Sequence, residues 1–153
     1  MWIQPHLNFD GRCDEAIAFY RTALGAQLTM LLRYKEVPVE PDTQKWKPSP
    51  EIAEKVCHAA LRVGETAILL SDGRSLGKPT FNGIMLSLNV QSDAEAKQFF
   101  AALSDGGTVF MPLGKTFFSS SFGMVTDRFG VYWMVFVGNE SSNGRPREQG
   151  NRM

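Results

Sequence analysis

The residues best suited to chemistry in this chain are its histidines, and His58 is the more informative of the two. It stands in an alternating segment, residues 56–63, on the face opposite to the more apolar side chains. Asp72 closes the next apolar segment, within Ser71-Asp72-Gly73. A carboxylate beside an imidazole can orient it as a general base. Two interpretations stay open: His58 and Asp72 are catalytic, or His58 is satisfied by a local hydrogen bond and Asp72 forms a turn.

Other motifs exclude several classes of site. Cys13 and Cys57 show no CxxC pair or other metal-binding spacing, so we expect ordinary reduced thiols. The serines at 119–121 have no surroundings typical of a nucleophile elbow. The glycines form neither a GxGxxG pattern nor a P-loop, and no S-adenosylmethionine site is recognisable. We therefore expect no nucleotide cofactor.

The elements that position these residues come from an internal duplication. Residues 15–20 (EAIAFY) align with residues 95–100 (EAKQFF), and both segments have apolar residues at helical spacing. The first helix is expected to end at Gly25. In the second, Ser92 and Glu95 form a capping-box pattern at the N-terminus.

Strand-like segments flank both predicted helices in the same order. In the first half they span residues 2–9, 27–34, 56–63 and 66–71, and in the second half 84–90, 108–111, 122–127 and 131–137. Each half is therefore β-α-β-β-β. We predict an α+β fold in a single domain, residues 1–138, made of two modules over residues 1–73 and 80–138.

Two segments lie outside the repeat. Residues 35–55 form an insertion in the first module, where Ser49, Pro50 and Glu51 are typical of a helix start and predict a short helix over 49–55. Residues 139–153 are polar with no hydrophobic period, and we expect a poorly packed C-terminal tail.

Composition narrows the class of protein. The chain has 153 residues, 43% of them hydrophobic, which is enough to form a core without disulfides. The 16 basic and 16 acidic residues give no net charge, which argues against a nucleic-acid or membrane-surface partner. No apolar run approaches the length of a membrane span, and the first residues lack a signal-peptide pattern. We expect a cytoplasmic protein.

Three sequence blocks, together with the paired modules, point to a family. The blocks are residues 13–26, residues 58–72 and, most specifically, residues 122–134 (FGMVTDRFGVYWM). In these the chain resembles the vicinal oxygen chelate superfamily of glyoxalase I, extradiol dioxygenases, and bleomycin and fosfomycin resistance proteins. Within that superfamily it is most similar to the PhnB-like branch, also labelled demethylubiquinone methyltransferase-like. The resemblance implies that each module forms a U-shaped half-barrel around a cavity, and that modules pair within a chain or across a homodimer.

The resemblance also implies where a metal would bind. Metal-dependent members place His, Glu or Gln on the first and last strands of each module. Those positions fall here on Pro5, Leu69 or Leu70, Gly83 and Met134. None of these provides the nitrogen or oxygen donors that Fe, Mn, Ni or Zn require. His6 stands one residue from the first position, and a one-residue slip turns a strand side chain to the opposite face. We therefore expect no metal site.

The strands that the resemblance places around the cavity carry aromatic and soft side chains. The candidate ligand-binding residues are Trp46, His58, Phe117, Phe118, Trp133 and Met134. The leading hypothesis is a metal-independent binding protein for an apolar or aromatic small molecule. The alternatives are a metal-dependent lyase, isomerase or dioxygenase with non-standard ligands, and a metal-free enzyme that uses His58 and Asp72.

Overall fold

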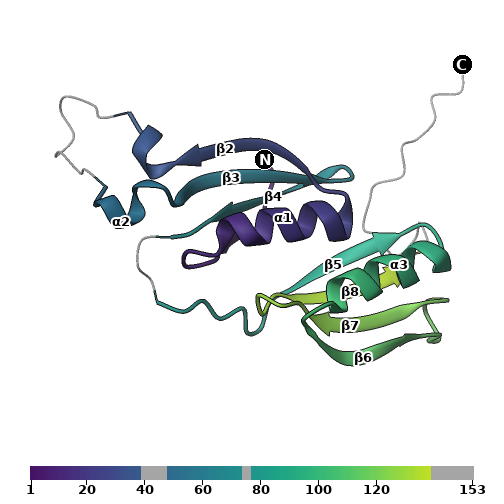
Figure 1. Ribbon diagram of the computed structural model, residues 1–153. Helices are drawn as coiled ribbons and strands as arrows, with labels where there is room; N and C mark the ends of the chain where they lie inside the picture. Colours follow the sequence, from purple (N-terminus) through teal and green to yellow (C-terminus); the bar gives the residue numbers. More distant parts are fainter. Residues whose placement is uncertain (39–47, 74–76, 139–153) are drawn as a thin grey trace, which may run out of the picture. The chain divides into compact units, whose positions relative to one another are not determined.

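The computed structural model describes residues 1–38, 48–73 and 77–138 (Figure 1). Trp46, much of the predicted insertion and the predicted tail at 139–153 lie outside these residues. The chain divides after Thr80 into two compact units, which we describe separately. Among the described residues, no helix combines the length and the apolar character needed to cross a membrane.

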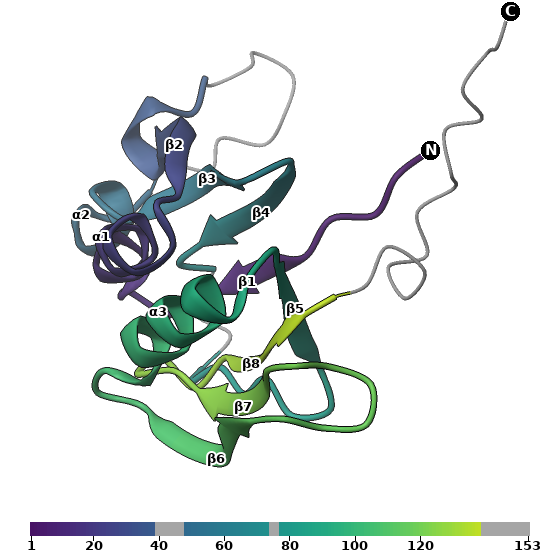
Figure 2. The ribbon, with the colours of Figure 1, turned by 90° about the vertical axis from the view of Figure 1, so that its right-hand side faces the viewer.

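The first unit is one four-stranded sheet with a helix against it. Its elements are β1 (His6–Asn8), α1 (Cys13–Leu24), β2 (Gln27–Arg33), the 3₁₀ helix η1 (Tyr34–Glu36), α2 (Pro50–Ala53), β3 (Val56–Val63) and β4 (Thr66–Ser71). The strand order is β1-β4-β3-β2, with β1 parallel to β4 and the other pairs antiparallel. Figure 2 shows α1 alongside this sheet.

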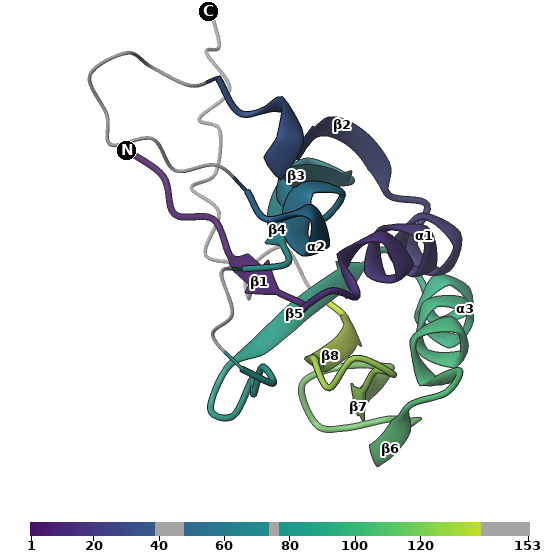
Figure 3. The ribbon, with the colours of Figure 1, turned by 60° about the vertical axis from the view of Figure 1, so that its left-hand side comes forward.

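The second unit repeats the arrangement. Its elements are β5 (Met85–Val90), α3 (Asp93–Ser104), β6 (Thr108–Gly114), β7 (Phe122–Thr126) and β8 (Tyr132–Val137). The order β5-β8-β7-β6 again has one parallel pair, β5 with β8. Figure 3 shows α3 against this sheet. The predicted α+β fold of two β-α-β-β-β modules is confirmed, and both sheets stay open, with two edges each.

Local signals explain the two long helices. Helix α1 buries the apolar stripe that its spacing predicts, and it ends where Gly25 takes a left-handed conformation (φ 63°) that L side chains rarely adopt. Helix α3 begins with the predicted cap: Ser92 Oγ accepts a hydrogen bond from the Glu95 backbone N–H at 3.2 Å. The Glu95 carboxylate in turn accepts one from the Gln91 N–H at 2.8 Å.

Three predicted elements differ in extent. Strand β1 covers only residues 6–8 of the expected 2–9, the residues that pair with β4. The insertion helix is shorter than predicted, since α2 spans four residues and the Ser49 side chain makes no capping bond. Strand β6 is longer and continues to Gly114 through Pro112, which an edge strand tolerates.

Each sheet has a buried face and an open face. In the first unit, Leu7, Ala59 and Leu70 are neighbours across three strands and are nearly inaccessible to solvent, like the buried side of α1. In the second unit, the buried face carries Val125, Trp133 and Val135 on the paired strands β7 and β8. Side chains one residue away point to the other face. The candidate site residues are therefore sorted by which face they occupy.

Candidate functional site

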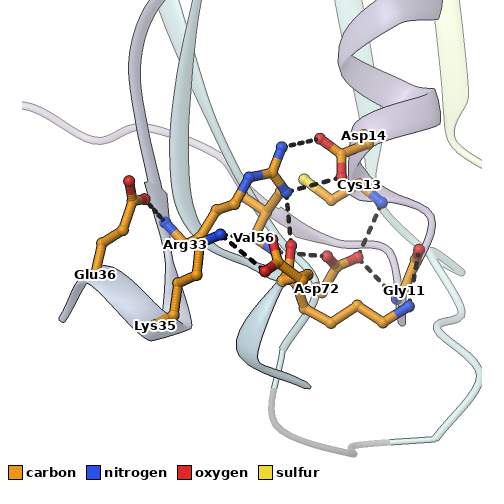
Figure 4. Close-up of polar contacts among 10 residues, drawn as sticks. Gly11, Cys13, Asp14, Arg33, Lys35, Glu36, Val56 and Asp72 are labelled. Carbon is orange, nitrogen blue, oxygen red and sulfur yellow. Dashed lines mark hydrogen bonds and ion pairs between the residues drawn. The ribbon is translucent and has the colours of Figure 1, made fainter. Parts of the chain in front are cut away.

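Asp72 lies in the interior of the first unit, where its carboxylate holds three chain segments together (Figure 4). Oδ1 accepts hydrogen bonds from the backbone N–H groups of Gly11 at 2.7 Å and Cys13 at 2.9 Å. Oδ2 accepts one from the Val56 N–H at 2.8 Å. The carboxylate caps the N-terminus of α1 from a distance, since Arg12 at the N-cap makes no side-chain capping bond. The interpretation of Asp72 as the partner that orients His58 is therefore replaced by a structural one.

An ion-pair cluster of side chains that are at least partly exposed lies beside this buried carboxylate (Figure 4). The Arg33 guanidinium donates to both oxygens of Asp14, at 3.0 and 2.9 Å, and to the Glu54 backbone carbonyl. The hydrogen bond from Arg33 holds the pKa of Asp14 below its usual value. Lys35 pairs with the Glu54 carboxylate at 2.8 Å. These contacts tie α1, β2 and the segment after α2 together at the surface, so we assign them to folding.

Cys13 is not arranged as a reactive group. Both are free thiols, as expected from the sequence. Cys13 is wholly buried, and burial raises the pKa of its thiol far above the usual value, so the nucleophilic thiolate is suppressed. Cys57 is partly buried on β3.

His58 lies beside the other histidine on the open face of the first sheet. The rings of His6 and His58 have centroids 5.7 Å apart with a 59° tilt. His6 Nε2 lies 3.0 Å from the Ser71 hydroxyl, which donates to Asn8 Oδ1. Burial, followed by the proximity of His58, lowers the pKa of His6. The neighbour of His58 is thus an imidazole rather than the carboxylate of Asp72.

The donor groups do not match the metal centre of the superfamily. His6, not Pro5, faces the open side beside Leu69, because the two residues are paired in the parallel ladder of β1 and β4. In the second unit Gly83 precedes β5, and Met134 lies on the open face next to Met124. Nowhere in the described residues do three His, Cys, Asp or Glu side chains gather into a group that could hold a metal ion. Two imidazoles without a carboxylate do not meet the requirement of a hard divalent ion.

The second sheet carries a cavity on its open side. Its volume is about 340 Å³, and its lining includes Asn82, Ile84, Met85, Phe110, Met124 and Tyr132. Met85 and Tyr132 are neighbours across the parallel pair of β5 and β8. The ladder of β6 is irregular between Val109 and Met111, and Phe110 between them contributes to the lining.

One end of this cavity is polar. Tyr132 Oη donates a hydrogen bond to Asn82 Oδ1 at 3.3 Å. None of the lining side chains is that of Asp, Glu, Lys, Arg or His. The cavity therefore offers soft apolar walls, two aromatic rings and an amide–phenol pair to an uncharged compound.

The predicted aromatic wall is divided between the two faces of the second sheet. Trp133 is only 4% exposed, and its indole N–H donates to Asp127 Oδ2 at 2.9 Å, so it is a core residue and our assignment of it to the cavity wall is corrected. Met134 lies on the open face. Phe117 and Phe118 are exposed, and their rings are in edge-to-face contact. The Phe118 ring makes a second edge-to-face contact with Phe122, with the two ring centroids 5.1 Å apart.

The sequence contained a signal that would have separated these residues. Trp133 and Met134 are consecutive in a strand, so they cannot face the same side, whereas Tyr132 and Met134 can. If Trp133 is taken as the buried residue, this alternation predicts that Tyr132 lies on the open face with Met134 and is a candidate for the cavity wall. The irregularity in β6 that brings Phe110 to the cavity carries no such periodic signal.

Comparison with known proteins identifies the family. Residues 2–136 match the family described as 3-demethylubiquinone-9 3-methyltransferase. Protein YjdN of Escherichia coli (strain K12) is 37% identical over 142 residues, which cover 90% of this chain and 95% of that protein. The crystal structure of protein PA1353 from Pseudomonas aeruginosa is 42% identical, with a TM-score of 0.78 and coverage of 90% of this chain and 98% of that one. A putative 3-demethylubiquinone-9 3-methyltransferase, PhnB protein, from Bacillus cereus is 23% identical, with a TM-score of 0.69 and coverage of 90% and 100%.

More distant structures share the fold alone. A glyoxylase/bleomycin resistance protein/dioxygenase domain from Frankia sp. EAN1pec is 16% identical with a TM-score of 0.60, covering 90% of this chain and 94% of that one. The fosfomycin resistance protein FosX from Listeria monocytogenes is 10% identical with a TM-score of 0.62, covering 92% and 95%. These structures share the two-module fold that the resemblance to the vicinal oxygen chelate superfamily implies. The chain belongs to the PhnB-like family described as 3-demethylubiquinone-9 3-methyltransferase.

Proposed function

We propose that this protein binds an uncharged apolar or aromatic small molecule in the cavity on the open face of its second sheet, without a metal ion. The observation that carries the proposal is the cavity itself, about 340 Å³ with thioether and aromatic walls. That volume lies at the lower end of the range for small-molecule sites. A compound with one or two rings suits it.

The chemistry of the walls supports this choice of ligand. Met85 and Met124 provide flexible, polarisable contacts, and Phe110 provides a ring against which a planar compound can pack. Phe110 is 74% exposed, so a ligand there would cover apolar surface that now faces water. An ionic ligand would lose hydration without gaining a charged partner from these walls. We expect micromolar affinity, about −8 kcal/mol.

Metal independence is part of the proposal, and the donor groups support it. The rival is a lyase, isomerase or dioxygenase with non-standard metal ligands. Elemental analysis of protein purified without chelator distinguishes the two. Well under one equivalent of metal is expected, and near-stoichiometric Fe, Mn, Ni or Zn would overturn this part of the proposal.

The binding test uses thermal shift and intrinsic fluorescence against a panel of small neutral aromatics. Phe110→Ala removes a ring from the cavity and should weaken binding of any hit by about tenfold, since aromatic contacts contribute roughly 0.5–1.5 kcal/mol beyond the buried area. Phe117→Ala is the matched control, because Phe117 is fully exposed and belongs to the separate aromatic series. Equal losses in both variants, or no hit in the panel, would contradict the proposal.

We also propose that the chain forms a homodimer. Val109 and Met111 on the edge strand β6 are exposed apolar side chains, and they support an interface with a second chain. Each chain has a mass of 17.0 kDa, so light scattering should give a molar mass of about 34 kDa for a dimer. A mass near 17 kDa at micromolar concentration would refute the dimer. A cytoplasmic location and the absence of a nucleic-acid partner remain predictions from the sequence.

A further inference from the structure

The two histidines of this protein come together although 51 residues separate them in the chain. The sequence contains no others. His6 is on β1 and His58 is on β3, the two strands that flank β4, and their ring centroids are 5.7 Å apart. His6 is exposed and His58 is partly exposed, so a small ligand can reach both rings. This pair lies in the first unit and shares no residue with the cavity of the second unit.

A hydrogen-bond chain fixes which nitrogen of His6 is available. Asn8 Oδ1 can only accept, so the Ser71 hydroxyl donates to it. The oxygen of Ser71 then accepts the Nε2 hydrogen of His6, 3.0 Å away. Ser71 is buried, which holds this chain in place. In a neutral His6 ring, Nδ1 therefore carries a lone pair, and it becomes a second donor only when the ring takes up a proton.

Among the described residues that neighbour the pair in its sheet, none has an acidic side chain that would compensate imidazolium charge. Along β4 the adjacent side chains are Leu69 and Ser71, and on β2 the residues paired nearby are Met30 and Leu32. On β3 the charged residue of this face is Arg62, two positions beyond Ala60, and its guanidinium donates to Gln27. The charged group that acts on His6 is His58 itself. The site therefore becomes cationic when a ring takes up a proton, with no acidic side chain beside it on this face in the described part of the first unit.

We propose that the His6–His58 pair binds the oxyanion group of a small acidic ligand, which accepts hydrogen bonds from both imidazoles. A divalent cation fits less well, because no carboxylate or thiolate offsets its charge and no third donor from His, Cys, Asp or Glu joins the two rings in the described residues. An oxyanion supplies the negative charge that this face lacks. The inference goes beyond the proposed function, since it concerns a different sheet and a ligand of opposite character.

Binding must be coupled to proton uptake. Burial lowers the pKa of His6, so the free ring is neutral at pH 7 and above. A bound anion favours the protonated form and raises the pKa of the ring. By linkage, affinity increases as the pH falls, by about tenfold per pH unit for each proton taken up between the free and the bound pKa.

The test is an NMR titration of the full-length protein between pH 5.5 and 8, following the carbon-bound imidazole protons of the two histidines. Sodium sulfate is the probe, since it is doubly charged throughout this range, and sodium chloride at equal ionic strength is the control. Sulfate is expected to raise the pKa of His6, and its apparent affinity should fall about tenfold from pH 6.5 to 7.5.

Three variants show which groups bind the anion. His6→Gln and His58→Gln should each weaken sulfate binding at pH 6 by at least about tenfold, whereas Arg62→Gln, on the same strand and face as His58, should leave it unchanged. Circular dichroism verifies folding, and the wild-type titration requires no variant. The proposal is overturned if sulfate shifts the imidazole titration no more than chloride does, or if Arg62→Gln abolishes sulfate binding. Stoichiometric Zn²⁺ binding that needs both histidines would also overturn it in favour of a cation site.

Discussion

Replacing Asp72 by Asn tests whether this carboxylate supports the fold rather than catalysis. The amide keeps one oxygen, which can still accept from the Gly11 and Cys13 N–H groups, but its NH₂ group faces the Val56 N–H. A buried donor without a partner costs about 1–3 kcal/mol. The two remaining bonds lose their charge assistance, roughly 1 kcal/mol each. We expect the free energy of unfolding to fall by about 3–5 kcal/mol.

Urea unfolding followed by far-UV circular dichroism measures this loss, and the melting temperature should fall by roughly 10 °C. Amide hydrogen exchange adds local detail, because protection should drop first at Gly11, Cys13 and Val56. Asp105→Asn is the matched control. Its carboxylate is 78% exposed in a surface ion pair with Arg128, so that variant should lose less than about 1 kcal/mol.

The opposite pattern would refute the structural interpretation of Asp72. If Asp72→Asn unfolds like the wild type but loses binding or turnover of a ligand, the carboxylate acts on the ligand or on His58. Destabilisation of similar size in the Asp105→Asn control would show that the effect is not specific to the buried hydrogen bonds.

Two further variants probe packing and protonation. Gly123→Ala would place a Cβ 2.7 Å from Phe100 Cε2 and 3.0 Å from the Leu113 Cα. We therefore expect urea unfolding to show a loss of about 1–3 kcal/mol in the free energy of unfolding. An unchanged urea midpoint would show that α3 and β7 can move apart at no cost in stability. The folded-state pKa of His6 is lowered, so the unfolded chain binds the proton more tightly and stability should fall as the pH drops below about 6.5. His6→Gln should reduce this loss between pH 7.5 and 5.5, and an identical pH dependence in the variant would contradict it.

Periodicity predicted most of the fold because each module is built from local signals. The alternation of residues 56–63 and 66–71 gives the bounds of β3 and β4 as observed, and the Ser92–Glu95 cap forms as expected. Where a predicted strand differs in length from the observed one, a contact between distant residues sets the observed bounds. Strand β1 is limited to residues that pair with β4, and the sequence before residue 6 carries no mark of that limit.

The candidate site was predicted less well, because its chemistry depends on contacts between distant residues. The position of Asp72 after a strand suggested a turn or a catalytic carboxylate, but its three backbone donors come from residues 16 to 61 positions away. In the sequence, His6 stands next to an empty metal position, and nothing there connects it with His58. Its approach to His58 follows from the strand order β1-β4-β3, which alternation within one strand does not specify.

The two open faces should respond differently to pH, and this difference identifies which unit binds a given ligand. The cavity of the second unit is lined by no histidine, carboxylate, lysine or arginine, so binding of a neutral aromatic there should change less than about twofold between pH 6 and 8. Binding at the His6–His58 pair should weaken by tenfold or more over the same range, since it requires a proton. Isothermal titration of one compound at pH 6, 7 and 8 gives the slope directly. A neutral aromatic that binds with the steep slope and loses affinity in His58→Gln would contradict the assignment of such ligands to the cavity of the second unit.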